Sequence, residues 1–413
     1  MATPPDPRTS TRTPISQLSK HEIYWRDRYD WLKECGYELR PRFRPRWTPS
    51  WQTDSNRLAS LSEDGWSLMS GAIIDAVRVQ DKTQVSLKKI DNTVHSEEVG
   101  IAKYFAELGP SAANHCVPIL EFLHPPNEPT ITIIVMPLLR AYDSPRFDTF
   151  GEAVEFFRQM FEGLQFMHQH GIAHRDCNSN NIMMDGTPMY PQGFHPDMLH
   201  QYRKREVHYG DYSHAKHYTR TQRPVKYYFI DFGLSRRYTS EQIAAGPIWE
   251  DIILGGDKSP PEHQDERQIQ ADPFATDIYY LGNLIRWEFI EGWPRRPIYG
   301  RRGFEFMKPL VDDMVQDDPT KRPKIDEIVQ RFAEIQKQLG WWKLRSRVLG
   351  KREFKYYEAY EDMLKLQSKR DAGAHNFLER RHLAVELQAL YYRLDNVTKV
   401  STAESVCARK HVI

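Results

Sequence analysis

The sequence predicts an α+β fold in which strand-like segments come before helical ones. Residues 66–90 alternate apolar and polar side chains in the manner of paired strands, and the apolar run 131–139 is typical of a buried strand. Apolar residues then recur at the i, i+3, i+4 spacing of one buried helix face: Val154, Phe157, Met160, Phe161, Leu164 and Met167. A β-rich part of the chain therefore precedes a mainly helical part.

A polar loop follows this helix and leads into a short apolar strand. Gly171 ends the helix, and the loop holds His174-Arg175-Asp176 and then Asn181. Such a charged triplet taken alone is usually a solvated turn. A second strand pattern ends in Asp231-Phe232-Gly233. Together these residues provide hard oxygen ligands for Mg²⁺ and one further carboxylate, which is the set that phosphoryl transfer requires.

These motifs resemble those of the protein kinase superfamily. His174-Arg175-Asp176 with Asn181 is similar to the catalytic loop, and Asp231-Phe232-Gly233 is similar to the metal-binding loop that opens the activation segment. Three downstream residues continue the resemblance: Glu262, Asp277 and Arg322, of which the last would pair with Glu262. The resemblance covers about residues 62–338, and over this range the chain is similar above all to kinase-like proteins found in fungi.

The resemblance implies a bilobal protein-kinase-like fold, with a small β-rich lobe and a larger helical lobe. The expected divisions are a disordered N-terminus (1–20), an arm that packs on the kinase domain (21–61), the kinase domain (62–338, with the small lobe to about 139, the large lobe over 140–338 and an insertion at about 185–223) and a helical C-terminal extension (339–413).

The same resemblance implies an ATP-dependent protein kinase that transfers the γ-phosphoryl group of Mg-ATP to a protein hydroxyl, with Ser or Thr as the expected acceptor. Asp176 would orient the acceptor hydroxyl, and Asn181 and Asp231 would hold Mg²⁺. Lys88 would hold the nucleotide phosphates, braced by Glu98, with Glu97 and Glu107 as alternative partners. The other expected nucleotide contacts are Gly71, Ile73, Ser86, Met136, Pro137, Leu139 and Met183.

The sequence departs from the family at two functional positions. The family has a Gly-x-Gly-x-x-Gly loop before the lysine, whereas this chain has Trp66-Ser-Leu68-Met-Ser-Gly71, so that only the third glycine is kept and side chains would hinder a close backbone approach to phosphates. Ser/Thr kinases usually carry Lys two residues after the catalytic Asp and a Thr before the closing Ala-Pro-Glu. Here these places are Asn178 and about Gly255, so the acceptor type does not follow from the resemblance.

Two alternatives stay open beside the kinase. A pseudokinase that acts as a scaffold or allosteric partner, with weak or no turnover, is favoured by the incomplete glycine loop and opposed by the complete set of charged site residues. A small-molecule kinase of related fold is disfavoured by Glu262, Asp277 and Arg322, which mark a large lobe built for peptide substrates.

Positively charged residues at two places suggest how the protein is regulated and what kind of partner it binds. Arg175 is of the type that pairs with a phosphorylated activation segment, and Tyr238, Thr239 and Ser240 lie in that segment. A solvated loop is the plain interpretation of the insertion. The other is a docking site for an acidic or phosphorylated partner, formed by Arg203-Lys204-Arg205, Lys216, Arg220 and Arg223.

Composition argues against several other classes of protein. The chain has 57 basic and 56 acidic residues, so no global field indicates nucleic acid or membrane as a partner. Residues 22–51 interleave arginines with aromatic residues, as single-stranded nucleic-acid binders do, but the acidic residues among them favour a packed arm. Four scattered cysteines indicate a reducing compartment. Because no signal-peptide or membrane-span pattern is present, we expect an intracellular protein, cytoplasmic or nuclear.

Overall fold

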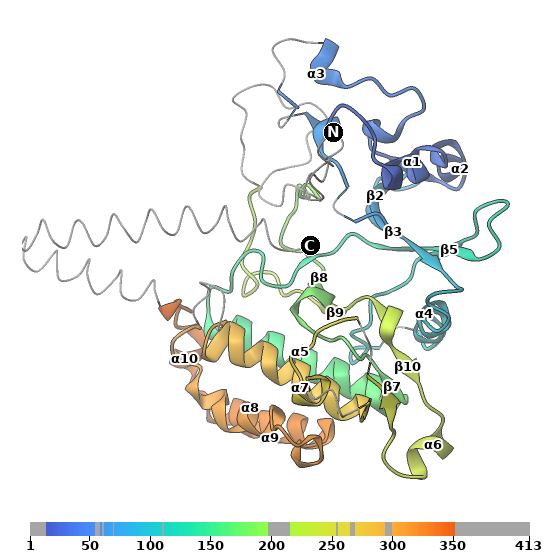
Figure 1. Cartoon of the computed structure of the whole chain (residues 1–413). Helices are drawn as coiled ribbons and strands as arrows, with labels where there is room; N and C mark the ends of the chain where they lie inside the picture. Colours follow the sequence, from blue (N-terminus) through green and yellow to red (C-terminus); the bar gives the residue numbers. More distant parts are fainter. Residues whose placement is uncertain are drawn as a thin grey trace, which may run out of the picture.

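The computed structural model describes residues 14–53, 58–59, 62–68, 70–109, 111–196, 215–252, 255–264, 269–293 and 300–351. Most of the expected C-terminal extension and most of the expected disordered N-terminus lie outside the described residues. Within them the chain has two lobes, a sheet with flanking helices and a larger helical body, which confirms the predicted α+β bilobal fold (Figure 1). No helix of the described part is both long enough and apolar enough to cross a membrane.

The small lobe contains a five-stranded antiparallel sheet in the order β1-β2-β3-β5-β4. Its strands are β1 (Tyr37–Leu39), β2 (Ile73–Arg78), β3 (Gln84–Asp91), β4 (Glu121–Leu123) and β5 (Ile131–Pro137), and helix α4 (Glu98–Glu107) accompanies them. The predicted alternation holds in β3, where Val85 and Leu87 are buried on one face while Ser86 and Lys88 are half-buried on the other. The sheet therefore has an apolar outer face and a mixed face turned toward the cleft.

The N-terminal arm covers the outer face of this sheet. Helices α1 (Lys20–Arg26) and α2 (Tyr29–Glu34) place Trp25 and Leu32 in one apolar cluster with Leu87 and Val135, and all four side chains have no more than 1% of their surface exposed. Strand β1 also comes from this segment and pairs with β2. The interleaved aromatic and arginine residues of the arm are thus used in packing, as the packed-arm interpretation expected.

A long connection joins β1 to β2 in place of a tight turn. The described residues between these strands include the short 3-10 helices η1 (Pro41–Phe43) and η3 (Glu63–Gly65) and the helix α3 (Ser50–Thr53). Arg42, which is buried, donates to both carboxylate oxygens of Glu22 in α1 and to the carbonyl oxygen of Asp64 in η3. Five N–H donors of a buried guanidinium need such partners, so this residue fixes the connection to the arm.

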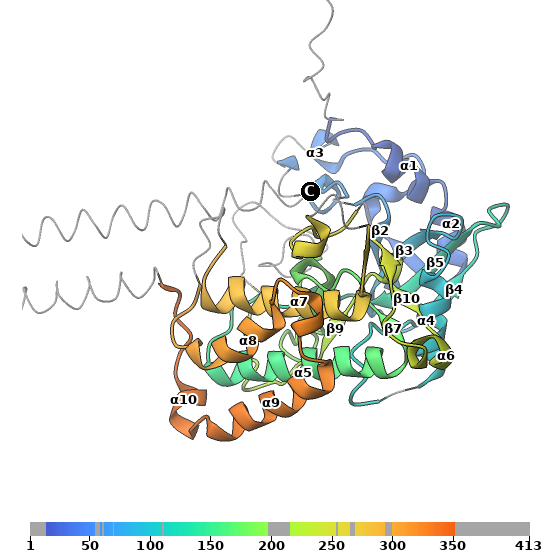
Figure 2. The ribbon, with the colours of Figure 1, turned by 60° about the horizontal axis from the view of Figure 1, so that its bottom comes forward.

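The large lobe is organised around one apolar helix. Its helices are α5 (Phe150–Gln169), α6 (Ser240–Ala244), α7 (Pro273–Ile285), α8 (Lys308–Met314), α9 (Ile325–Gln338) and α10 (Trp341–Arg345). The predicted face of α5 is buried, and its Phe161 ring packs edge-on against Phe332 of α9, with ring centroids 5.1 Å apart. Figure 2 shows α5 and α9 side by side along the base of this lobe.

In the described part of the chain, three small sheets of two or three short strands hold the loops that lie between the lobes. Strands β6 (Arg140–Ala141), β8 (Ile182–Met184) and β9 (Tyr227–Phe229) form one small sheet, β7 (Ile172–Ala173) pairs with β10 (Arg236–Arg237), and β11 (Glu250–Asp251) pairs with β12 (Gln270–Ala271). Each pair brings together segments that are distant in the sequence.

The described ends of the insertion are packed in part, since Arg220 is buried whereas Lys216 and Arg223 are exposed. Arg220 is 5% exposed and donates to the carbonyl oxygens of Tyr142 and Pro145, at 2.8 and 2.7 Å. Our prediction that Arg220 belongs to a solvent-exposed basic docking surface was therefore wrong, because its guanidinium satisfies buried carbonyls. Arg203-Lys204-Arg205 lie outside the described residues. His195 extends the insertion to the small lobe, with Nε2 3.0 Å from Oε2 of Glu63.

Candidate active site

The predicted catalytic loop is held by a buried aspartate of α7. The backbone N–H groups of His174 and Arg175 donate to the two carboxylate oxygens of Asp277, at 2.8 and 2.7 Å, and Asp277 is fully buried. Arg175 has φ of 66°, in the left-handed region that costs energy for a residue with a side chain. The two hydrogen bonds to one carboxylate maintain this conformation and so fix the residue that follows, Asp176.

The carboxylate of Asp176 accepts hydrogen bonds from three directions. Nδ2 of Asn181 donates to its Oδ2 at 2.8 Å, and Nδ2 of Asn178 donates to its Oδ1 at 2.7 Å. The backbone N–H of Asp257, in the activation segment, also donates to Oδ1 at 3.2 Å. Gly256, at φ of 73°, allows this approach, since a Cβ there would lie 3.3 Å from the same oxygen.

Lys88 lies between two carboxylates that come from different parts of the chain. Its Nζ is 2.5 Å from Oε1 of Glu98, on α4, and 2.8 Å from Oδ1 of Asp231. The lysine and Glu98 side chains are 11% and 2% exposed, whereas the Asp231 side chain is about half exposed. Of the three acidic residues considered as partners of Lys88, Glu98 is thus the one in contact.

The metal-binding loop is oriented by its neighbours. Asp231 has φ of 64°, and its Oδ1 accepts the N–H of Gly233. The Phe232 ring is buried against Phe105 of α4 and His174 of the catalytic loop, with centroids 5.6 and 5.7 Å away. Packing of this ring therefore directs Asp231 toward Lys88.

Ionisation in this cluster follows from burial and charge. Burial raises the pKa of Asp176 above its ordinary value, although the hydrogen bonds it accepts favour the ionised form. Burial acts to raise the pKa of Asp231 as well, but the Lys88 ammonium outweighs it, so that this pKa lies below the ordinary value. Burial acts to lower the pKa of Lys88, and the two carboxylates raise it above the ordinary value. Asp231 and Lys88 therefore stabilise each other as an ion pair.

Four of the residues expected to contact nucleotide lie on one face of the sheet. The register pairs Ser86 with Met136 and Ile73 with Lys88, which puts these four residues on the cleft face. Pro137 and Leu139 follow along the connector between the lobes, and Met183 lies on β8 beneath it. The N–H of Leu138, between them, donates to the carbonyl oxygen of Gln84.

Gly71 is placed against the arm. The indole N–H of Trp25 donates to its carbonyl oxygen at 3.3 Å, and a Cβ at Gly71 would come within 2.4 Å of Nδ1 of His21. These contacts give the glycine a packing reason that does not involve a nucleotide. The long β1–β2 connection also means that the residues aligned with the glycine loop do not join two adjacent strands by a short turn.

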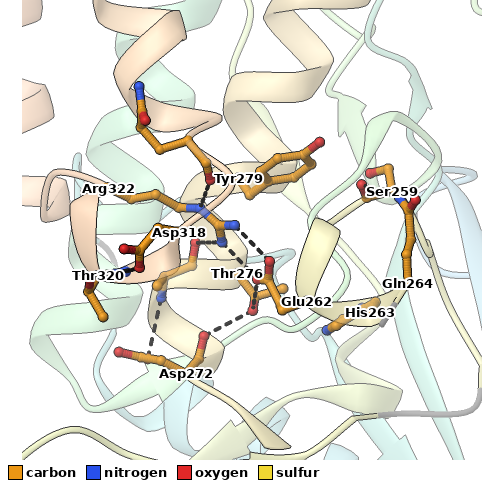
Figure 3. A network of polar contacts seen from close by, with 12 residues as sticks. Ser259, Glu262, His263, Gln264, Asp272, Thr276, Tyr279, Asp318, Thr320 and Arg322 are labelled. Carbon is orange, nitrogen blue, oxygen red and sulfur yellow. Dashed lines mark hydrogen bonds and ion pairs between the residues drawn. The ribbon is translucent and has the colours of Figure 1, made fainter. Parts of the chain in front are cut away.

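Two of the downstream motif residues, Glu262 and Arg322, meet in the large lobe, as Figure 3 shows. Arg322 and Glu262 form a bidentate ion pair, with both N–O distances 2.7 Å and both side chains at most 1% exposed. Nε of Arg322 donates to the carbonyl oxygen of Gln316, and the hydroxyl of Thr276 donates to Glu262. This cluster ties the end of the activation segment to α7.

Several residues of the site were not predicted. Asp75 lies on the cleft face and forms an ion pair of 2.8 Å with Arg40, both buried. His95 Nδ1 lies 3.2 Å from the carbonyl oxygen of Gly233. Asp257 contributes its backbone N–H to Asp176. The only available sequence signal was the Gly255-Gly256 pair before Asp257, which permits a close backbone approach.

Comparison with known proteins agrees with this geometry. Residues 69–246 match the family model described as the protein kinase domain. A light-sensor protein kinase of Ceratodon purpureus is 25% identical over 222 residues, which are 47% of this chain and 15% of that protein. The serine/threonine-protein kinase CAK1 of Saccharomyces cerevisiae (strain ATCC 204508 / S288c) is 39% identical over 56 residues, which are 14% of this chain and 15% of that protein.

The chain thus spans about 15% of the length of each of these relatives. The matched family region contains Lys88, Glu98, Asp176, Asn181 and Asp231. Motifs, fold and similarity agree that residues 69–246 form a domain of the protein kinase superfamily.

Proposed function

We propose that the chain transfers the γ-phosphoryl group of Mg-ATP to a protein hydroxyl. One observation carries the proposal: Lys88 contacts both Glu98 and Asp231, while Asp176 is held by Asn181 in the adjoining loop. The arrangement gathers a phosphate ligand, two oxygen donors and a candidate base around one cleft. Serine or threonine as the acceptor is supported by the printed name of the yeast relative, over a short match.

The residues present fit a Mg²⁺ ion. The amide nitrogen of Asn181 donates to Asp176, so its oxygen is the atom available to a cation. The Asp231 carboxylate is about half exposed and its lowered pKa keeps it ionised. Asn181 and Asp231 would hold the ion, which when bound neutralises charge on the nucleotide phosphates.

The chain's own groups perform the remaining tasks. Lys88 binds phosphate oxygens through its ammonium, and Glu98 holds that ammonium in place. Asp176 accepts a hydrogen bond from the acceptor hydroxyl and takes its proton as the γ-phosphoryl group passes from ATP to that oxygen and ADP leaves. The hydrogen-bond donors around Asp176 fix the direction of its carboxylate. They contribute to catalysis by positioning this group and take no part in covalent chemistry.

A nucleotide-binding or scaffolding pseudokinase is the second candidate. The observation that favours it is that Gly71 packs on the arm, so that this glycine has a structural role apart from any phosphate. This would weaken nucleotide binding without removing any proposed metal ligand or the base.

An intracellular location stays part of the proposal. Cys116 and Cys177 are buried free thiols, which is typical of proteins in reducing compartments.

Calorimetry and turnover together test the proposal. We expect weak ATP binding that requires Mg²⁺, loss of this Mg²⁺-dependent binding in Asp231→Asn, and phosphorylation of dephosphorylated casein that falls by about 10²–10⁴ in Asp176→Asn. Asp176→Asn should still bind ATP, and Asn180→Ala, an exposed change in the same loop, should retain activity. Binding without turnover would favour the pseudokinase, and absence of ATP binding would refute the kinase and the nucleotide-binding pseudokinase and leave the scaffold.

A further inference from the structure

Arg175, which precedes the proposed base, points its side chain at the activation segment. Its Nη2 donates to the carbonyl oxygen of Asp251 at 3.0 Å and lies 4.0 Å from Oε2 of Glu250. The Arg175 side chain is only 11% exposed, so its charge needs a nearby anion. The partner found there is a carboxylate that belongs to the unmodified chain.

A second guanidinium reaches the same carboxylate. Nη1 of Arg236, on β10, is 3.1 Å from Oε2 of Glu250. Glu250 is itself 17% exposed and sits on β11, which β12 holds in place. One anion between two arginines is the arrangement that a phosphate in an activation segment would create.

The strand that carries Arg236 also connects the two halves of the site. Its backbone pairs with β7, directly before His174. The next residue, Arg237, lies with its guanidinium 3.6 Å from the ring centroid of Tyr104 on α4, the helix that carries Glu98. Ordering of this strand by Glu250 thus acts on both the catalytic loop and the helix that braces Lys88.

Two of the three candidate phosphorylation sites in the activation segment, Tyr238 and Thr239, make local contacts. Tyr238 is 5% exposed, and its ring packs against Phe274. The hydroxyl of Thr239 accepts the N–H of Gln242 as the cap of α6. Thr239 and Ser240 are both exposed, whereas Tyr238 is buried.

We infer that Glu250 is a positioning residue: its carboxylate, held between Arg175 and Arg236, takes the place of an activation-segment phosphate. The inference rests on the proposed kinase activity for its kinetic consequence, since Glu250 acts on Asp176 through Arg175. The protein then needs no phosphorylation of Tyr238, Thr239 or Ser240 to be active. Glu250 lies outside the region that matches the family model.

The first experiment uses the full chain treated with a broad-specificity phosphatase, with loss of phosphate verified by intact mass. Turnover of Mg-ATP with dephosphorylated casein should be unchanged by the treatment. Glu250→Gln should lower kcat by about tenfold, the scale of a hydrogen bond to a charged group, with KM for ATP unchanged. Glu241→Gln, a charge removal on exposed α6, is the matched control and should retain kcat. Loss of activity on phosphatase treatment, or full activity in Glu250→Gln, would overturn the inference.

A double variant tests the pairing itself. In the double variant Arg236→Gln, Glu250→Gln, the loss of kcat, expressed as a free energy, should be smaller than the sum of the losses in the two single variants. The reason is that each single change already removes the same ion pair. Strict additivity would overturn the shared role.

Hydrogen exchange separates this inference from the proposed function. In the nucleotide-free protein, Glu250→Gln should speed exchange in residues 172–178 and 236–252, and Glu241→Gln should not speed it in residues 172–178. If the unaltered protein shows no turnover, the proposed function fails while this measurement still decides the role of Glu250. Equal exchange rates of residues 172–178 in the Glu250→Gln and Glu241→Gln variants would then refute the positioning role of Glu250.

Discussion

Asn178 donates a 2.7 Å hydrogen bond to Oδ1 of Asp176, so a neutral amide stands where Ser/Thr kinases usually carry a lysine. The N–H of Asp257 donates to the same oxygen, in the region where those kinases carry a threonine hydroxyl. The proposed base therefore keeps its donors although both family side chains are missing. Neither replacement donor carries a charge.

Replacing Asn178 with Ala should lower kcat by about tenfold, since a donor to the Asp176 carboxylate is lost. The KM for ATP should change little, because Lys88 and its partners are untouched. Asn178 also caps η4 (Ser179–Asn181), so Asn178→Asp, which keeps the cap acceptor but has no donor, should be impaired at least as much. Steady-state kinetics decide the matter. An active Asn178→Asp variant would show that only the cap is important.

Gly71→Ala should destabilise the small lobe by about 1–3 kcal/mol, because the new methyl group would overlap His21. Gly100→Ala on α4, where a Cβ meets nothing within 4 Å, should stabilise the protein by about 0.5–1 kcal/mol. Thermal unfolding measures both changes. A Gly71→Ala protein of normal stability but reduced ATP affinity would instead assign the glycine to the phosphate site.

Arg322→Ala should destabilise the large lobe by about 3–5 kcal/mol, because it leaves the Glu262 carboxylate buried and unpaired. The comparison variant is Arg331→Ala, which removes a partly exposed arginine that pairs with Asp313 and Glu327. Its unfolding temperature should stay close to that of the unaltered protein. Equal shifts in the two variants would contradict a special role for the buried pair.

The stabilisation from this pair should depend on pH in a defined direction. Burial acts to raise the pKa of Glu262, but Arg322 outweighs it and holds the pKa below the ordinary 4.5. A carboxyl with a depressed folded-state pKa stabilises the fold above pH 4.5, and this stabilisation is lost as the pH falls through the lower folded value. The gap in unfolding temperature between unaltered protein and Glu262→Gln should therefore be largest near pH 7 and narrow below pH 4.5. A difference in unfolding temperature that instead grew as the pH fell would mean that folding raises the pKa of Glu262.

Short-range patterns account for what could be predicted from the sequence. Asp176 and Asn181 are five residues apart in one loop, and Asp231 directly follows an apolar strand, so the family's motifs could be matched to them along the sequence. Strand alternation placed Lys88 on the polar face, where the structure has it. Glu98 was chosen because apolar residues follow it as they do in the family.

Contacts between distant segments account for what was missed. No local pattern in the sequence connects Arg40 with Asp75, and the pairing of β1 with β2 brings the two segments together. Arg220 likewise looked like part of a basic patch, although its burial depends on carbonyl groups more than 70 residues away. No local pattern distinguishes such a buried charge from an exposed one.

Strand β1 lies outside the part of the chain that carries recognisable motifs, and the family match begins at residue 69. A protein shortened to the matched region would lose this strand together with α1 and α2. The hydrogen-bonding edge of β2 would then be unpaired, and the fully buried side chains of Leu87 and Val135 would face solvent. An open strand edge beside an apolar face is a template for pairing with another copy, so we expect the shortened protein to self-associate.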